Sequence, residues 1–118
     1  MTTDAAQTRR VLGLLGLGVR GRRAVVGVER VRDAVKKGTV RVAVVAADAS
    51  RHSLDKIVGL LEARHVPTLR VESAGDLGAA VGRETTAVVG VMDAQLAKGI
   101  LAAVGTTAAL QSGSRRKG

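Results

Sequence analysis

The 118-residue sequence contains no cysteine, no aromatic residue and a single proline. The absence of cysteine excludes disulfide scaffolds, thiolate zinc sites, iron–sulfur clusters and cysteine nucleophiles. The absence of Phe, Tyr and Trp removes the side chains on which single-stranded nucleic acids stack, so RRM-like and OB-like binding is not expected. No run approaches the about eighteen apolar residues that a membrane span requires. We therefore expect a cytoplasmic protein that does not contact membranes.

The residues that are present indicate a compact domain. Apolar residues make up 46% of the chain, which is too many for a chain that is disordered throughout. The length fits one domain with one hydrophobic core. We expect a flexible lead-in over residues 1–7, a folded domain over residues 8–104 and a basic, disordered tail over residues 105–118.

Positive charge is concentrated in the first third of the chain, which has a net charge of +9 overall. Residues 9–41 hold ten basic side chains and two acids, a local charge of +8, whereas residues 42–114 carry a net charge of −1. This asymmetry indicates a polyanionic partner such as RNA. A surface that serves only solubility would give the same count.

Apolar periodicity and turn residues predict helices and strands in alternation. Helices are expected over residues 8–18, 28–37, 54–64, 74–81 and 94–104, the last three capped by Ser53, Ser73 and Asp93. Strands are expected over residues 24–26, 40–46, 68–71 and 86–92. The alternation implies an α/β fold, a three-layer α/β/α sandwich with a small mixed four-stranded sheet.

Catalytic and nucleotide sites receive little support. Residues 16–21 spell G-x-G-x-x-G, which binds a dinucleotide only between a strand and the helix that it opens. Here the glycines close a predicted helix, which favours a flexible basic turn over a nucleotide-dependent enzyme. His52 and His65 lack metal-ligand spacing, and the serines and aspartates fit helix caps. We expect no enzymatic activity, no cofactor and no metal site.

The segment around Gly27 is the strongest candidate site. Gly27 is predicted to open a helix whose free N–H groups and positive dipole end face the basic loop before it, where they can hold a phosphate or a base edge. Glu29 can accept hydrogen bonds from guanine, and Arg30 can donate to phosphate or guanine. A purely structural alternative is that Glu29 complements the helix dipole and Arg30 pairs with Asp33.

These residues belong to a longer pattern that extends over residues 8–104. It comprises, in order, Leu14-Leu15-Gly16-Leu17, basic residues through Arg23, Gly27-Val28-Glu29, Lys37-Gly38, the strand Val40–Ala46, Ala47-Asp48-Ala49-Ser50, the Val66-Pro67 turn, Asp76–Gly82 and Val88–Asp93. In order and spacing, these segments resemble the ribosomal protein L7Ae/L30e family, in particular its branch of small bacterial YlxQ-type proteins.

The resemblance implies an α/β/α sandwich that binds RNA kink-turns, which are sharply bent helix–bulge–helix elements with tandem sheared G·A pairs. It also implies that the glycine-opened helix enters the major groove at these pairs and that a second loop covers the flipped bulge nucleotides. On this basis the expected RNA-binding residues are Arg20, Arg22, Arg23, Gly27, Val28, Glu29, Arg30, Asp33, Lys37, Arg83, Glu84, Thr85 and Thr86.

Together these observations predict a non-catalytic RNA-binding protein, associated with the ribosome or another structured RNA and monomeric when free. The alternative is a ribosome-assembly or protein-interaction adaptor that keeps the scaffold and binds RNA weakly and without specificity. Glu29 and Asp33 favour the adaptor, because the resemblance implies Asn and Lys at these positions in strong kink-turn binders.

Overall fold

The computed structural model describes residues 5–104, in which helices and strands alternate along the chain. The elements are α1 (Ala5–Arg20), β1 (Ala24–Val26), α2 (Val28–Lys36), β2 (Val42–Ala46), α3 (Arg51–Ala63), β3 (Thr68–Val71), α4 (Ala74–Ala80), β4 (Val88–Val91) and α5 (Ala94–Ala103). None of the helices between residues 5 and 104 combines the length and apolar character of a bilayer span.

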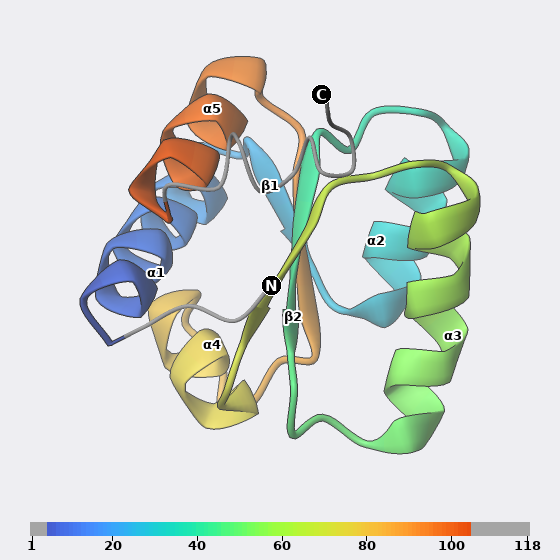
Figure 1. Ribbon diagram of the computed structural model, residues 1–118, viewed down its shortest axis with the longest axis horizontal. Coiled ribbons are helices and arrows are strands. Elements are labelled where there is room, and N and C mark those ends of the chain that lie inside the picture. The colour runs from blue at the N-terminus through green and yellow to red at the C-terminus, as the bar shows by residue number, and fades with distance from the viewer. Residues whose placement is uncertain (1–4, 105–118) are drawn as a thin grey trace, which may run out of the picture.

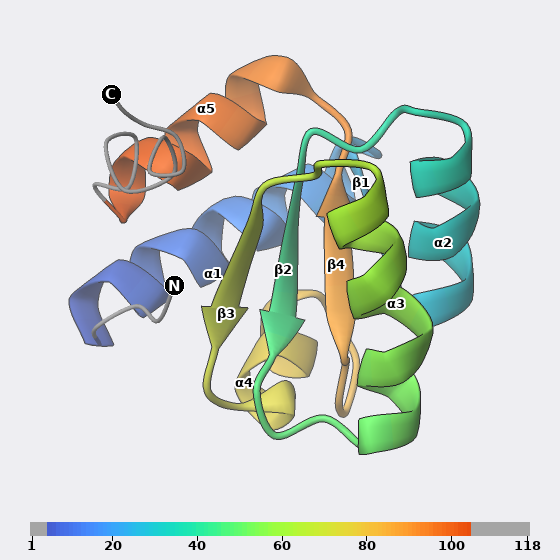
Figure 2. The same ribbon diagram turned by 45° about the vertical axis from the view of Figure 1, so that its right-hand side comes forward.

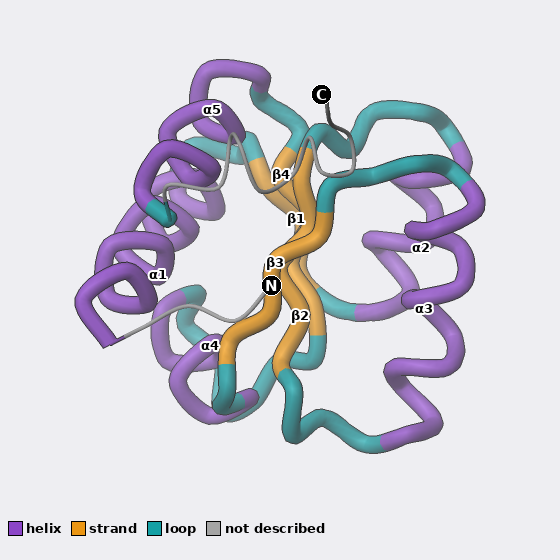
Figure 3. The backbone as a smooth tube through the Cα atoms, viewed as in Figure 1, coloured by secondary structure: helices purple, strands orange, loops and turns teal. Residues whose placement is uncertain are grey.

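The strands form one four-stranded sheet in the order β1-β4-β2-β3. β2 and β3 are parallel, whereas β4 is antiparallel to both of its neighbours, so the sheet is mixed as predicted. Helices α1, α4 and α5 cover one face and α2 and α3 cover the other (Figure 1, Figure 3). The predicted three-layer α/β/α sandwich is therefore confirmed.

The core is built almost entirely from aliphatic side chains on both faces of the sheet. β2 is buried along its whole length because strands flank it on both sides and helices cover both faces. Its side chains alternate between the two layers: Val42, Val44 and Ala46 pack toward α1, α4 and α5, and Ala43 and Val45 pack toward α2 and α3.

The first helix is longer than predicted. It begins at Ala5, so residues 5–7 of the expected lead-in are helical, and it continues to Arg20. Two of its glycines, Gly16 and Gly18, are packing positions: a Cβ at Gly16 would lie 2.8 Å from the Ala80 carbonyl oxygen, and one at Gly18 would clash with the Leu96 side chain. The G-x-G-x-x-G run thus lies mainly inside a helix and does not open one after a strand, so it lacks the setting of a dinucleotide site. Residues 1–4 and the expected tail over residues 105–118 lie outside the described residues.

Two of the three predicted helix caps are confirmed. Ser73 caps α4 and Asp93 caps α5, and each accepts a hydrogen bond from the backbone N–H three residues later. The prediction for α3 is wrong, because Ser50 is the cap and its Oγ accepts from the N–H of Ser53 at 3.1 Å. Both serines precede apolar helical positions, and the helix simply begins one turn earlier than the periodicity indicated.

Loops gather at two ends of the sheet (Figure 2). At one end, the lower one in Figure 2, β1, β2 and β3 finish, β4 starts, and α2, α3 and α4 begin. At the other, β1, β2 and β3 start, β4 finishes, α1, α2 and α3 end, and α5 begins. We call them the Gly27 end and the Arg23 end, after the residues that flank β1.

Candidate nucleic-acid interface

Helix α2 begins at a glycine in a conformation that other residues rarely adopt. Gly27 has φ 100° and ψ 155°, and its N–H donates to the Val88 carbonyl at 3.0 Å, which fixes the helix start beside β4. Among the described residues no side chain caps α2, whereas side chains cap α3, α4 and α5. The N–H groups of the first turn of α2 are therefore open to an acceptor from outside the protein.

The connection from α4 to β4 lies beside this helix start, because β1 and β4 are paired. Its backbone is held against α4: the N–H of Arg83 donates to the Gly78 carbonyl at 2.7 Å, and the N–H of Thr86 donates to the Ala74 carbonyl at 3.0 Å. A Cβ at Gly78 would lie 2.7 Å from the backbone of Thr85, so the close contact depends on glycine. The structure thus brings the predicted loop next to the predicted helix start.

The residues of this loop differ in their exposure. Arg83, Glu84 and Thr85 are exposed, whereas Thr86 is buried, with only 5% of its surface accessible. In this conformation the Thr86 side chain supports the loop from inside, and the three residues before it form the outer surface.

The polar side chains of α2 differ in their contacts. Glu29 forms an exposed ion pair with Lys56 of α3 at 3.7 Å, and Arg32 donates to the Lys56 carbonyl, so both tie α2 to α3. Arg30 and Asp33 are exposed. They form no ion pair with each other within residues 5–104, so the structural alternative of an Arg30–Asp33 pair is not realised. The Arg30 guanidinium is free to contact a ligand.

Val28, the first residue of α2, is half-buried, and the other predicted residues, Arg20, Arg22, Arg23 and Lys37, lie at the Arg23 end. The Arg23 carbonyl accepts from the Met92 N–H at 2.8 Å, where β4 finishes, and Lys37 is the C-cap of α2. Four residues of extended chain separate the backbones of Arg23 and Gly27 by ~13 Å. The prediction that the N–H groups of α2 face the basic loop is therefore wrong, because β1 carries the chain from one end of the sheet to the other.

The two ends carry opposite charge when their loops and adjoining helical turns are counted with histidine neutral. The Gly27 end has a net charge of −2, from three cations (Arg30, Arg51 and Arg83) and five acids (Glu29, Asp48, Glu72, Asp76 and Glu84). The Arg23 end has a net charge of +4, from seven cations (Arg20, Arg22, Arg23, Lys36, Lys37, Arg41 and Arg64) and three acids (Asp33, Glu62 and Asp93). The basic surface and the open helix start are thus separate features.

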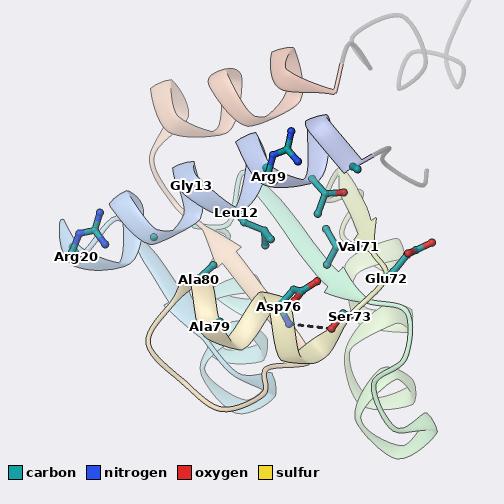
Figure 4. Close-up of a pocket in the computed structure, with 13 residues that line it drawn as sticks. Arg9, Leu12, Gly13, Arg20, Val71, Glu72, Ser73, Asp76, Ala79 and Ala80 are labelled. Carbon is teal, nitrogen blue, oxygen red and sulfur yellow. Dashed lines mark hydrogen bonds between the residues drawn. The ribbon is translucent and has the colours of Figure 1, made fainter.

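Arg20 faces a cavity of about 910 Å³ between α1 and α4 (Figure 4). Its guanidinium lies 3.6 Å from the position that a Cβ of Gly16 would occupy, so the side chain folds back along α1. Arg9, Glu72 and Asp76 also line this cavity, which therefore carries mixed charge. Sequence analysis missed it, because no local motif links α1 to the distant α4.

Comparison with known proteins places these features in a wider context. Residues 9–100 match the model of the ribosomal protein L7Ae/L30e/S12e/Gadd45 family. The RNA-binding protein YlxQ of Bacillus subtilis (strain 168) is 32% identical over 80 residues, which cover 68% of this chain and 80% of that protein.

Two solved structures share the fold. A protein of unknown function from Bacillus halodurans C superimposes with a TM-score of 0.74 and 31% identity, over 81% of this chain and 97% of that one. The Giardia lamblia 15.5kD RNA binding protein superimposes with a TM-score of 0.76 over 92% of this chain and 93% of that one. At 21% identity, the second likeness concerns the fold alone.

Proposed function

Because this chain belongs to the ribosomal protein L7Ae/L30e/S12e/Gadd45 family, we propose that it is a non-catalytic RNA-binding protein that recognises structured, kink-turn-like RNA at its Gly27 end. The observation that carries the proposal is the adjacency of the uncapped start of α2 and the exposed loop Arg83–Thr85, fixed by the hydrogen bond from Gly27 to Val88. The similarity to YlxQ, an RNA-binding protein, supports RNA as the ligand.

The chemistry of the Gly27 end suits a folded RNA. The N–H groups of the first turn of α2 donate to a phosphate or a base edge. The space beside Gly27 is open, since a Cβ there would meet nothing within 4 Å, so an RNA backbone can approach closely. Arg30 donates to guanine or phosphate, and Glu29 accepts from guanine once it leaves its exposed ion pair, which costs less than about 1 kcal/mol.

The loop adds a second contact on the far side of the same RNA. Arg83 to Thr85 project beside the helix start, so an RNA that bends sharply can touch both elements at once. In this proposal the RNA is ribosomal or belongs to another cytoplasmic ribonucleoprotein, and the protein is a monomer when free.

The test compares a labelled kink-turn RNA with a straight duplex of matched composition, because the chain has no aromatic residue to report binding by fluorescence. We expect the kink-turn RNA to bind about tenfold or more tightly than the duplex. The double variant Arg30→Ala/Arg83→Ala should lose this preference, since each contact to a base contributes about 1–3 kcal/mol. The variant Arg10→Ala/Arg70→Ala removes the same charge away from the Gly27 end and should keep the preference for the kink-turn RNA. Equal affinity of the natural protein for both RNAs would overturn the proposal.

A second candidate is favoured by one observation, the excess of acids at the Gly27 end. Five acids against three cations repel phosphate, and complement a basic protein surface instead. On this view the chain is an adaptor in ribosome assembly that binds RNA weakly. Hydrogen exchange of the complex with a captured protein partner would then show protection at α2 and the loop 82–87, and the bent and straight RNAs would bind equally.

A further inference from the structure

Within residues 5–104, positive charge is concentrated on a surface away from the Gly27 end. Arg23 and Arg41 flank the end of β4: the Arg23 carbonyl accepts from the Met92 N–H at 2.8 Å, and the Arg41 N–H donates to the Val91 carbonyl at 2.7 Å. Because β1 and β2 lie on either side of β4, the backbones of Arg23 and Arg41 are about 10 Å apart. Two residues that are distant in sequence thus form one surface.

The end of α2 extends this surface. Arg64 Nη1 donates to the carbonyls of Val35 and Lys36, at 3.3 Å each, and so ties the last turn of α2 to the end of α3. Lys36 and Lys37 are exposed beside it. The negative end of the helix dipole accounts for cations at this position, but it does not account for those at the start of β1 and β2.

Arg22 lies in the left-handed region of backbone conformation, with φ 60°. Glycine and asparagine adopt this conformation with little strain, whereas a long side chain does so at a cost. The chain holds 15 glycines, one of them directly before this position, yet keeps arginine here. An exposed, charged side chain on a strained backbone points to a contact that the free protein does not make.

Within residues 5–104, none of these cations forms an ion pair. In the part of the chain that the structure describes, the one ion pair joins Glu29 to Lys56, away from this end. Asp93, two residues after the end of β4, is engaged as the N-cap of α5. Arg41 also lines a hollow of about 280 Å³ together with Gln95 and Lys98, so the basic surface continues onto α5.

We infer that this cationic surface, formed by Arg22, Arg23, Lys36, Lys37, Arg41 and Arg64, binds the phosphate backbone of a second RNA segment. The inference rests on the proposed function, because it takes RNA as the ligand of the protein. Cations spread over about 10 Å or more suit an extended polyanion better than a single small anion. An anionic membrane is a poor fit, since within residues 5–104 Leu17 is the one large hydrophobic side chain that is exposed. The Gly27 end lies at the opposite end of the strands, so each of the two surfaces can bind an RNA segment at the same time.

The experiment uses the full chain saturated with unlabelled kink-turn RNA and titrated with a labelled straight RNA duplex at several salt concentrations. The natural protein should form a ternary complex without releasing the first RNA. The slope of log affinity against log salt is negative, and in the variant Arg22→Gln/Arg23→Gln/Arg41→Gln its magnitude should fall by about 2–3, since each lost phosphate contact removes about 0.7–0.9. The control Arg9→Gln/Arg10→Gln/Arg70→Gln has the same net charge and should keep the slope.

Several outcomes would overturn the inference. Equal slopes for the two triple variants would do so, and so would displacement of the kink-turn RNA by the duplex. If the triple variant Arg22→Gln/Arg23→Gln/Arg41→Gln lost binding only to phosphatidylserine vesicles or only to polyglutamate, and not to RNA, the surface would be assigned to a membrane or to an acidic protein. If the natural protein shows no preference for bent RNA, the proposed function fails, but titration of the duplex alone still decides the role of the cationic surface. Should position 22 affect folding, judged by circular dichroism, the variant Arg23→Gln/Arg41→Gln replaces the triple variant.

Discussion

The Gly27 end and the Arg23 end are formed by opposite ends of the same strands, yet they offer a ligand different chemistry. At the Gly27 end the donors are backbone N–H groups, held in place by the helix and by a loop that packs on α4. At the Arg23 end they are long side chains around a net charge of +4, against −2 at the other end. Fixed donors discriminate between shapes, whereas mobile cations attract any polyanion.

In our proposal, affinity for RNA and selectivity among RNAs are assigned to different ends of the domain. In our proposal the Gly27 end recognises the bend of an RNA, and the Arg23 end supplies attraction that does not depend on sequence. Substitutions should therefore divide into those that alter selectivity and those that alter the dependence of binding on salt. The following predictions test that division, from the largest expected effect to the smallest.

Gly78→Ala should have the largest effect. The new Cβ would lie 2.7 Å from the backbone of Thr85, so the loop must move and the free energy of unfolding should fall by about 1–3 kcal/mol. The preference for bent RNA should fall with it, and the salt slope for duplex RNA should not change. Urea unfolding followed by circular dichroism measures the stability. Gly75→Ala in the same helix is the matched control, and an equal loss there would contradict the packing argument.

Asp93→Ala should change stability and affinity in opposite directions. Loss of the α5 cap lowers the free energy of unfolding by about 1 kcal/mol, while removal of an acid from the Arg23 end strengthens duplex binding. Asp93→Asn keeps a capping side chain, so it should strengthen binding without the loss of stability. Thermal unfolding and RNA titration check both parts, and weaker duplex binding in both variants would refute the assignment of charge to this end.

Arg22→Gly should stabilise the protein and lower its affinity for RNA. Relief of the strain in the left-handed backbone conformation raises the free energy of unfolding by about 0.5–1 kcal/mol. The lost cation reduces the magnitude of the slope of log affinity against log salt by about 0.7–0.9. Asparagine tolerates the same backbone conformation, so Arg22→Asn should show the same salt dependence as Arg22→Gly and a similar gain in stability. A lower stability in both variants would mean that the Arg22 side chain contributes to the fold itself.

Lys56→Gln should have the smallest effect. It breaks the exposed pair with Glu29, in which the Glu29 side chain is 77% exposed, so the free energy of unfolding should change by less than about 0.5 kcal/mol. Without Lys56, the Glu29 carboxylate no longer has to leave an ion pair before it accepts from guanine, so the affinity for kink-turn RNA should rise slightly. A change of several-fold, measured by titration with labelled RNA, would show that the pair organises the Gly27 end.

The fold was predictable from the sequence wherever the evidence was local. The strands 24–26 and 68–71 end at the predicted residues, since short runs of β-branched side chains between turn residues define them. The start of α3 was less predictable, because Ser50 and Ser53 lie three residues apart and either could cap a helix. The length of α1 was underestimated because glycines weaken helical propensity, whereas the packing of Gly16 against α4 and of Gly18 against α5 is a tertiary effect.

The site was predictable in part, for a different reason. The start of α2 could be placed from the residues and the loop before β4 from the resemblance, but the location of the charge depends on strand pairing. Arg23 is four residues from Gly27 and lies at the opposite end of the sheet, whereas Arg41 is far along the chain and lies beside Arg23. Linear charge counts cannot distinguish these cases.

The two hydrogen bonds from Arg64 to the last turn of α2 have a consequence for RNA architecture. They anchor one end of this helix to α3, while the bond from Gly27 to β4 anchors its other end. Nine helical residues span ~14 Å, and a rod fixed at both ends does not change length or tilt. Two RNA segments held at its two ends would therefore be kept at a constant separation, so that this small protein would act as a rigid spacer inside a larger ribonucleoprotein.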